Sequence, residues 1–387
     1  MKNVLRLMTF TALVAASAIT GFGQTAQPAA SPAAAPAADN KAKCDELYGV
    51  WRENRNGDAA AQAKAYESGK SFLGQCQGHE YLSYVEKWVP KYEAALKSLT
   101  LNKTYTDSFQ KKDWKGVVAS GKQLTAADQE NLPVFVTITY AGTQYAAANP
   151  TDESLNSDAI ASARRAISLV EAGKADAFTA EQWKTIGFEN KNELLAWLNY
   201  SIGYLNFKRN PGEAANYYVK ALQTEAKLKR DAAAYNTLAL AYQTAEYTPM
   251  AADYKANCAG KDLTDECKLK FDRMGLVVDR IIDAMARAVA LADSNPATKA
   301  KKAEWMATLE GFYKFRHEDK TDGLNELIAN IQSKPLLLPS MQTMPTPAAT
   351  TTPAGTTVSN TTTPAATTTT NNNATAKPAN NPPKPRN

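Results

Sequence analysis

The sequence predicts an all-α protein built from antiparallel helical hairpins, and two observations support this fold class. Residues 197–221 contain two amphipathic segments separated by the polar break Arg209-Asn210-Pro211-Gly212, which is the pattern of two helices folded back on each other. Apolar residues recur at helical spacing through most of residues 43–338, and no segment there has convincing strand character. We therefore expect helices throughout the folded region.

The hairpin at residues 197–221 has rings and small residues at regular positions. They are Trp197, Tyr200, Ser201 and Tyr204 in the first helix and Ala214, Tyr218 and Ala221 in the second. This spacing resembles the tetratricopeptide repeat, in which small residues lie where two helices touch and rings fill the gaps between them. The resemblance is specific over residues 194–228. It implies an irregular right-handed α-solenoid that binds other molecules more often than it transforms them.

Weaker copies of the pattern are found at residues 134–170, 231–292 and 299–333. Equivalent rings are 59, 38 and 70 residues apart, whereas the repeat has a period of about 34 residues. Two insertions explain the excess, at residues 174–190 and 248–274. The first insertion contains the capping box Thr179-Ala180-Glu181-Gln182 and a short helix. Residues 126–338 are therefore expected to form repeats with insertions.

The N-terminal end is expected to be processed. Residues 1–24 have two basic residues, an apolar stretch and a small-residue exit, as a secretory signal peptide has. The apolar stretch is shorter than the roughly 20 residues that cross a bilayer, so an uncleaved anchor is the weaker interpretation. We expect no stable membrane span after cleavage, and residues 25–42 form an Ala/Pro-rich linker.

Four helices are expected before the repeats, within residues 43–125. Their expected ranges are residues 45–55, 59–73, 80–99 and 114–124. Asn56-Gly57-Asp58 provides a turn and then an N-cap between the first two. These two helices would form a hairpin that seals the first end of the stack.

The segment at residues 134–140 is rich in β-branched residues, which favour strands. Its continuation places Ile138, Ala141, Gly142 and Tyr145 at the spacing of the repeat's first helix. Pro133 lies where a first helical turn would begin. We therefore predict a helix here.

The C-terminal end combines a short helix with a tail. Leu324, Leu327, Ile328 and Ile331 form an apolar face that stops at Pro335 and could cap the stack. Residues 339–387 are rich in Thr, Pro, Ala and Asn, and are expected to be disordered. This tail could be glycosylated or contact a cell wall as a spacer, or it could be an unmodified flexible end.

The four cysteines all follow the signal-like segment. Their even number in an exported chain indicates two disulfides, and the sequence-local pairing of Cys44 with Cys76 and of Cys258 with Cys267 is favoured over the two other pairings. There is no C-x-x-C motif, and the two histidines are far apart in sequence. We therefore expect structural disulfides and no metal site.

The net charge of +5 comes from the two ends of the chain. Five of the 44 basic residues lie in the signal-like segment and the tail, which leaves 39 basic against 39 acidic residues elsewhere. A neutral folded region lacks the basic excess that binding to phosphates requires. Nucleic acid is therefore excluded as a partner.

Catalytic motifs are incomplete in this chain. Ser108-Phe109-Gln110-Lys111 matches S-x-x-K without its partner motifs, and no phosphate loop, G-x-S-x-G or H-E-x-x-H is present. Glu67-Ser68 and Glu153-Ser154 resemble the Glu-Ser of lytic transglycosylases, but no sugar-cleft motif is nearby. We expect no enzyme activity and no cofactor.

The leading hypothesis is an exported, periplasmic or secreted scaffold that binds a protein or peptide of the cell envelope in a concave helical groove. The resemblance implies that polar residues on the first helix of each hairpin contact the partner. The candidates are Asn199, Asn206, Asn236 and Gln243, and the alternative for them is simple solvation. The alternative function is a cell-wall glycan-binding protein or a peptidoglycan hydrolase.

Overall fold

A computed structural model describes residues 38–261 and 264–343, and these residues form helices and no strand. The all-helical prediction is therefore confirmed for the described part of the chain. The expected signal peptide, most of the linker and residues 344–387 of the tail lie outside it. Packing divides the chain into two compact units, one up to Gln129 and one from Glu130.

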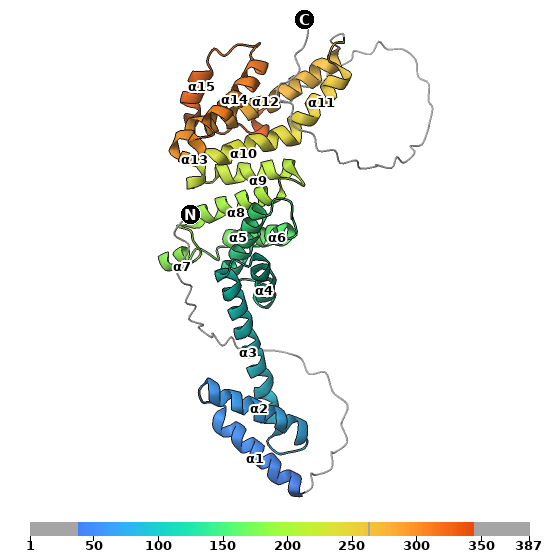
Figure 1. The fold of residues 1–387 in the computed structure, drawn as a ribbon, viewed down its shortest axis with the longest axis vertical. Coiled ribbons are helices and arrows are strands. Elements are labelled where there is room, and N and C mark those ends of the chain that lie inside the picture. Colours follow the sequence, from blue (N-terminus) through green and yellow to red (C-terminus); the bar gives the residue numbers. More distant parts are fainter. Residues whose placement is uncertain (1–37, 262–263, 344–387) are drawn as a thin grey trace, which may run out of the picture. The chain divides into compact units, whose positions relative to one another are not determined.

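The first unit begins with a helical hairpin. The unit contains α1 (Ala38–Asn54), α2 (Ala59–Gln75), α3 (Leu82–Gln110) and α4 (Trp114–Ala127) (Figure 1). α1 packs along α2, and the first part of α3 completes their small core. Asp58 begins α2 by accepting a 2.9 Å hydrogen bond from the Ala61 amide. The expected turn and N-cap between the first two helices are thus present.

A buried disulfide lies in this core. Cys44 of α1 is bonded to Cys76, which follows the last turn of α2, and both are fully buried. His79 lies next to the bond and contacts Asp45 of α1 through its Nε2 atom at 3.0 Å. The Cys44–Cys76 bond is the favoured pairing, and it connects α1 to the chain that follows α2. The histidine contact adds a second connection.

The largest differences from the sequence prediction in the first unit are at two helix ends. α1 begins at Ala38, so residues 38–42 are helical and are not part of a linker. α3 continues to Gln110 instead of stopping at residue 99. No glycine or proline interrupts residues 99–110, and Tyr105 and Ser108 are buried at the end of α3 that packs on α4. Residues 93–100 between the two packed ends are all exposed.

The second unit begins with two hairpins. They are α5 (Leu132–Ala148) with α6 (Asn156–Glu171), and α8 (Lys191–Asn206) with α9 (Pro211–Gln223). The short α7 (Ala180–Thr185) starts with the expected capping box, in which Thr179 and Gln182 each bond the other's backbone amide. α6 also packs on α8, so the two hairpins are in contact.

The β-branched segment is the helix α5, as the sequence predicts. Asn131 accepts a hydrogen bond from the Val134 amide at 3.3 Å and so starts the helix, with Pro133 in the first turn. α5 and α6 touch at Gly142, where an added Cβ would lie 2.3 Å from the Cβ of Ala159. This close approach explains the small residues at the helix contact.

The remaining helices pack around one long helix. α10 (Ala232–Tyr242) continues through a π-helical turn (Gln243–Tyr247) into α11 (Thr248–Asn257). The Cys258–Cys267 disulfide then joins α11 to α12 (Asp265–Leu291), as the favoured pairing predicts. α9 packs on α10, and α10 packs on α12.

Three helices follow α12. They are α13 (Pro296–Lys299), α14 (Lys302–Arg316) and α15 (Leu324–Asn330). α14 and α15 both pack against α12, and Leu324 and Ile331 are buried there. Short 3-10 turns are found at Lys227–Arg230, Ala292–Ser294, Ile331–Ser333 and Pro339–Met341. In the described residues, no helix has the length and apolar character needed to cross a membrane.

The expected tail boundary is wrong by several residues. Disorder was expected from residue 339, but Pro339–Met341 form a 3-10 turn. The Gln342 side chain donates a 2.8 Å hydrogen bond to the Leu276 carbonyl of α12. The described chain therefore remains attached to α12 through Gln342.

Candidate functional site

A hollow of about 500 Å³ lies on the second unit, between α6, α8 and α9. Its lining combines apolar, charged and amide side chains. The lining residues are Arg164, Ile167, Glu171, Leu195, Asn199, Tyr217, Lys220, Gln223 and Thr224. Asn199 is buried and Arg164 is about half exposed, so the lining offers both an inner amide and a cation that solvent can reach.

Arg164 is held in place by two side chains of α9. Its Nη2 atom donates a 2.7 Å hydrogen bond to Glu213 Oε1, and its Nε atom donates a 3.2 Å bond to the Tyr217 hydroxyl. These partners, with Tyr217 first, raise the pKa of the Arg164 guanidinium above its ordinary value. A cation fixed in this way loses little conformational freedom when it binds an anion.

A second cation, Lys220, also lies near the Tyr217 ring. The Nζ atom of Lys220 is 5.1 Å from the ring centroid, and the Arg164 guanidinium carbon is 5.9 Å from it. Glu171 is the one carboxylate that lines the hollow. Arg164 is paired with Glu213 and Glu171 adds a carboxylate, so the hollow offers charges of both signs, an amide and apolar side chains. Its guanidinium can bind carboxylates, and its amide can bind main-chain groups.

The structure separates the four predicted partner-binding residues. Asn199 lines the hollow, and its Nδ2 atom bonds the Leu195 carbonyl at 2.8 Å. Asn206 lies outside the lining but donates a 2.6 Å hydrogen bond to Glu213 Oε2. Asn236 on α10 and Gln243 in the π-helical turn are half-buried and do not line the hollow.

Sequence reasoning did not select Arg164, Tyr217 or Lys220, because it considered only the first helix of each hairpin. All three lie on second helices, α6 and α9. The adjacent pair Tyr217-Tyr218 could have indicated that Tyr217 lies at the surface of the hairpin. Tyr218 matches the repeat's buried ring and is fully buried, so its neighbour on the helix has to face elsewhere.

A second polar site lies on α12, and we call Arg280, Asp283 and Arg287 its charged face. All three are buried. Arg287 Nε bonds Asp283 Oδ2 at 3.0 Å, while Arg280 makes two bonds of 2.8 and 2.7 Å to Glu246 of the π-helical turn. Each buried cation is thus paired with a carboxylate, as burial of charge requires.

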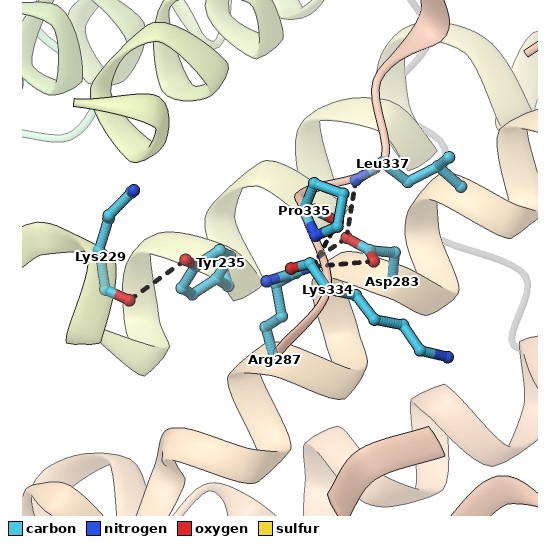
Figure 2. Close-up of polar contacts among 7 residues, drawn as sticks. All are labelled: Lys229, Tyr235, Asp283, Arg287, Lys334, Pro335 and Leu337. Carbon is cyan, nitrogen blue, oxygen red and sulfur yellow. Dashed lines mark hydrogen bonds and ion pairs between the residues drawn. The ribbon is translucent and has the colours of Figure 1, made fainter. Parts of the chain in front are cut away.

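The charged face holds a segment of the same chain that is extended at Lys334 and Leu338 and then enters the 3-10 turn Pro339–Met341 (Figure 2). We call residues 334–342 the strap. Arg287 Nη2 donates to the carbonyls of Lys334 and Pro335 at 2.9 and 2.8 Å, and Asp283 Oδ2 accepts from the Leu337 amide at 3.3 Å. The contacts move back along α12 as the strap advances, so the strap runs antiparallel to the helix.

Two tyrosines of α10 lie beside the charged face. The Arg280 guanidinium carbon is 4.7 Å from the Tyr242 ring centroid, and the Arg287 guanidinium carbon is 5.9 Å from that of Tyr235. The Tyr235 hydroxyl is fixed by a 3.2 Å hydrogen bond to the Lys229 carbonyl (Figure 2). The face therefore combines paired charges with rings on a neighbouring helix.

The two Glu-Ser pairs lie outside the hollow, and each glutamate contacts a cation. Glu67 is exposed and pairs with Lys70 at 3.0 Å, and Ser68 donates to the Leu47 carbonyl at 2.7 Å. Glu153 pairs with Arg209 at 2.7 Å. Neither glutamate lines the hollow.

The chain was compared with protein-family models, with curated proteins and with solved structures. None of the three comparisons finds a match.

Proposed function

We propose that this protein is an exported, non-enzymatic scaffold that binds a peptide segment of another protein. The single observation that carries the proposal is the fixed Arg164 guanidinium at the hollow between α6, α8 and α9. The two cations would bind a carboxylate of the partner. Asn199 would bind its main chain, and Ile167 and Leu195 would contact an apolar side chain.

The architecture in this proposal is an irregular right-handed α-solenoid resembling tetratricopeptide proteins. The packing of α5, α6, α8, α9, α10 and α12, each on the next, supports it, as does the fully buried Tyr218 at a position that the repeat fills with a ring. Export is supported by the signal-like residues 1–24 and by two disulfides, which persist in oxidising compartments.

A capture experiment with matched variants tests the function. The mature full-length protein is immobilised and exposed to cell-envelope extract, alongside Arg164→Gln and Asn199→Ala. Lys314→Gln is the control, because Lys314 is a partly exposed cation on α14 that pairs with Glu310. We expect captured proteins whose retention is lost in the two hollow variants and kept in the control.

Peptides from any captured protein then give an affinity. Loss of the Arg164 contact should weaken binding about tenfold or more, because a hydrogen bond to a charged group contributes about 1.5–3 kcal/mol. If no captured protein depends on Arg164 and Asn199, the scaffold proposal fails. Sedimentation of the protein with purified peptidoglycan in the same series would instead favour the cell-wall alternative.

A further inference from the structure

The strap is held mainly through its backbone. Two of its carbonyls and one of its amides contact the charged face of α12. Its apolar side chains are only partly buried at residues 336–338, and Lys334 and Pro335 are exposed. A segment with few buried apolar side chains opens at a low free-energy cost compared with the core.

The charged face is organised without the strap's help. Arg287 and Asp283 bond each other at 3.0 and 3.2 Å, and Glu246 fixes Arg280. When the strap leaves, the Nη2 atom of Arg287 loses two carbonyl acceptors. Asp283 loses one amide donor. The face therefore keeps its shape and regains a capacity to bind main-chain groups.

We propose that the charged face of α12 is a binding site for an extended peptide segment of a partner protein, and that the strap is its built-in occupant. The strap itself defines the chemistry that the face accepts. The carbonyls of Lys334 and Pro335 and the amide of Leu337 make the contacts. Three leucines lie between Pro335 and Pro339. Prolines favour the extended backbone that these contacts need.

The partner is therefore a leucine-containing segment bounded by prolines, and the charged face recognises it mainly through main-chain hydrogen bonds. Its sequence can vary between the prolines, because main-chain groups are the same in all non-proline residues. This site uses α12 and not the hollow between α6, α8 and α9, so it goes beyond the proposed function. A partner segment and the strap would compete for the same atoms.

One substitution can open the strap and leave the charged face unchanged. Leu337→Pro removes the amide hydrogen that Asp283 accepts, whereas Leu337→Ala keeps this amide and is the matched control. The probe is a fluorescent synthetic peptide with the sequence of residues 332–343. Binding is measured by anisotropy with full-length protein, and strap opening by hydrogen exchange of its remaining amides.

We expect faster exchange of the strap in Leu337→Pro, and peptide binding about tenfold or more tighter than to the unsubstituted protein or to Leu337→Ala. Adding Arg287→Lys to Leu337→Pro should remove most of this gain, because lysine lacks the guanidinium fork. Circular dichroism reports whether each variant keeps its helices. Arg164→Gln should leave this binding unchanged, which separates the site from the hollow.

Three results would overturn the proposal. An opened strap without peptide binding would show that the face does not accept an extended segment in trans. A strap that stays protected in Leu337→Pro would show that it is a permanent part of the fold. A concentration-dependent dimer of Leu337→Pro in sedimentation would assign the face to a second copy of the chain and not to a different protein.

Discussion

Asn206 and Glu213 connect the end of α8 to the first turn of α9. Asn206 Nδ2 donates a 2.6 Å hydrogen bond to Glu213 Oε2, and Glu213 Oε1 accepts from Arg164 of α6. One carboxylate thus closes a hairpin and also orients a cation of the neighbouring hairpin. Asn206 therefore influences the hollow without lining it.

Asn199 and Asn206 of α8 should respond differently to substitution. Asn206→Ala should lower the free energy of unfolding by about 1.5–3 kcal/mol, because a hydrogen bond to a charged group is lost. Asn199→Ala should cost less stability and should weaken binding at the hollow. Urea denaturation and peptide affinity measure the two effects, and equal stability losses would contradict this division.

The Cys44–Cys76 disulfide should stabilise the first unit and not the second. Cys44 and Cys76 close a loop with a sequence separation of 32, so replacing both by Ala should cost about 3–4 kcal/mol in the chain-entropy model. Hydrogen exchange should quicken in α1 and α2 and stay unchanged in the second unit.

The second disulfide provides a comparison for this effect. Cys258 and Cys267 are separated by 9 residues, and the shorter loop predicts a smaller cost of about 2–3 kcal/mol when both are replaced by Ala. The loss should be confined to the second unit. A larger effect than that of the Cys44–Cys76 pair would argue against loop entropy as the cause.

Two helical glycines should give opposite results when replaced by alanine. At Gly142 the new Cβ would lie 2.3 Å from Ala159 Cβ, so Gly142→Ala should destabilise by about 1–3 kcal/mol through overpacking. At Gly311 of α14 nothing lies within 4 Å, so Gly311→Ala should stabilise by about 0.5–1 kcal/mol. Thermal and urea unfolding of both variants check the difference in sign.

Alkaline pH should lower the free energy of unfolding of the second unit. Burial raises the pKa of Tyr242 and of Tyr247 to about 12, and it raises the pKa of Tyr218 as well. Because the folded pKa values exceed the unfolded value of about 10, this stabilisation is complete below pH 10 and declines as pH rises toward 12. Urea midpoints measured from pH 8 to 12 should fall above pH 10, and Tyr242→Phe should reduce the decline.

Helices, caps and disulfides could be predicted because local residues determine them. The caps Asn131, Asp58 and Thr179 each bond an amide three residues ahead. Each disulfide joins cysteines that are neighbours in the order of the sequence. The end of α3 could not be predicted in this way. Burial of Tyr105 and Ser108 against α4 extends that helix, and such packing depends on residues beyond the local pattern.

The charged face of α12 shows why the candidate sites were harder to predict. Arg280, Asp283 and Arg287 have the spacing of an ordinary solvated helix face, yet all three are buried. Their partners are Glu246 and the strap, and the strap is 47 to 54 residues away in sequence. Hydrophobic periodicity alone contains no information about a contact of that kind.

The exposed middle of α3 has a consequence for mechanics. Residues 93–100 have no buried side chain, so their helical state depends on intrinsic propensity, and Glu93, Ala94, Ala95, Leu96 and Lys97 are strong helix formers. This stretch is a strut whose stiffness comes from its own backbone hydrogen bonds. Under tension it should be the first part of the first unit to lengthen, while the disulfide-bonded hairpin of α1 and α2 stays folded.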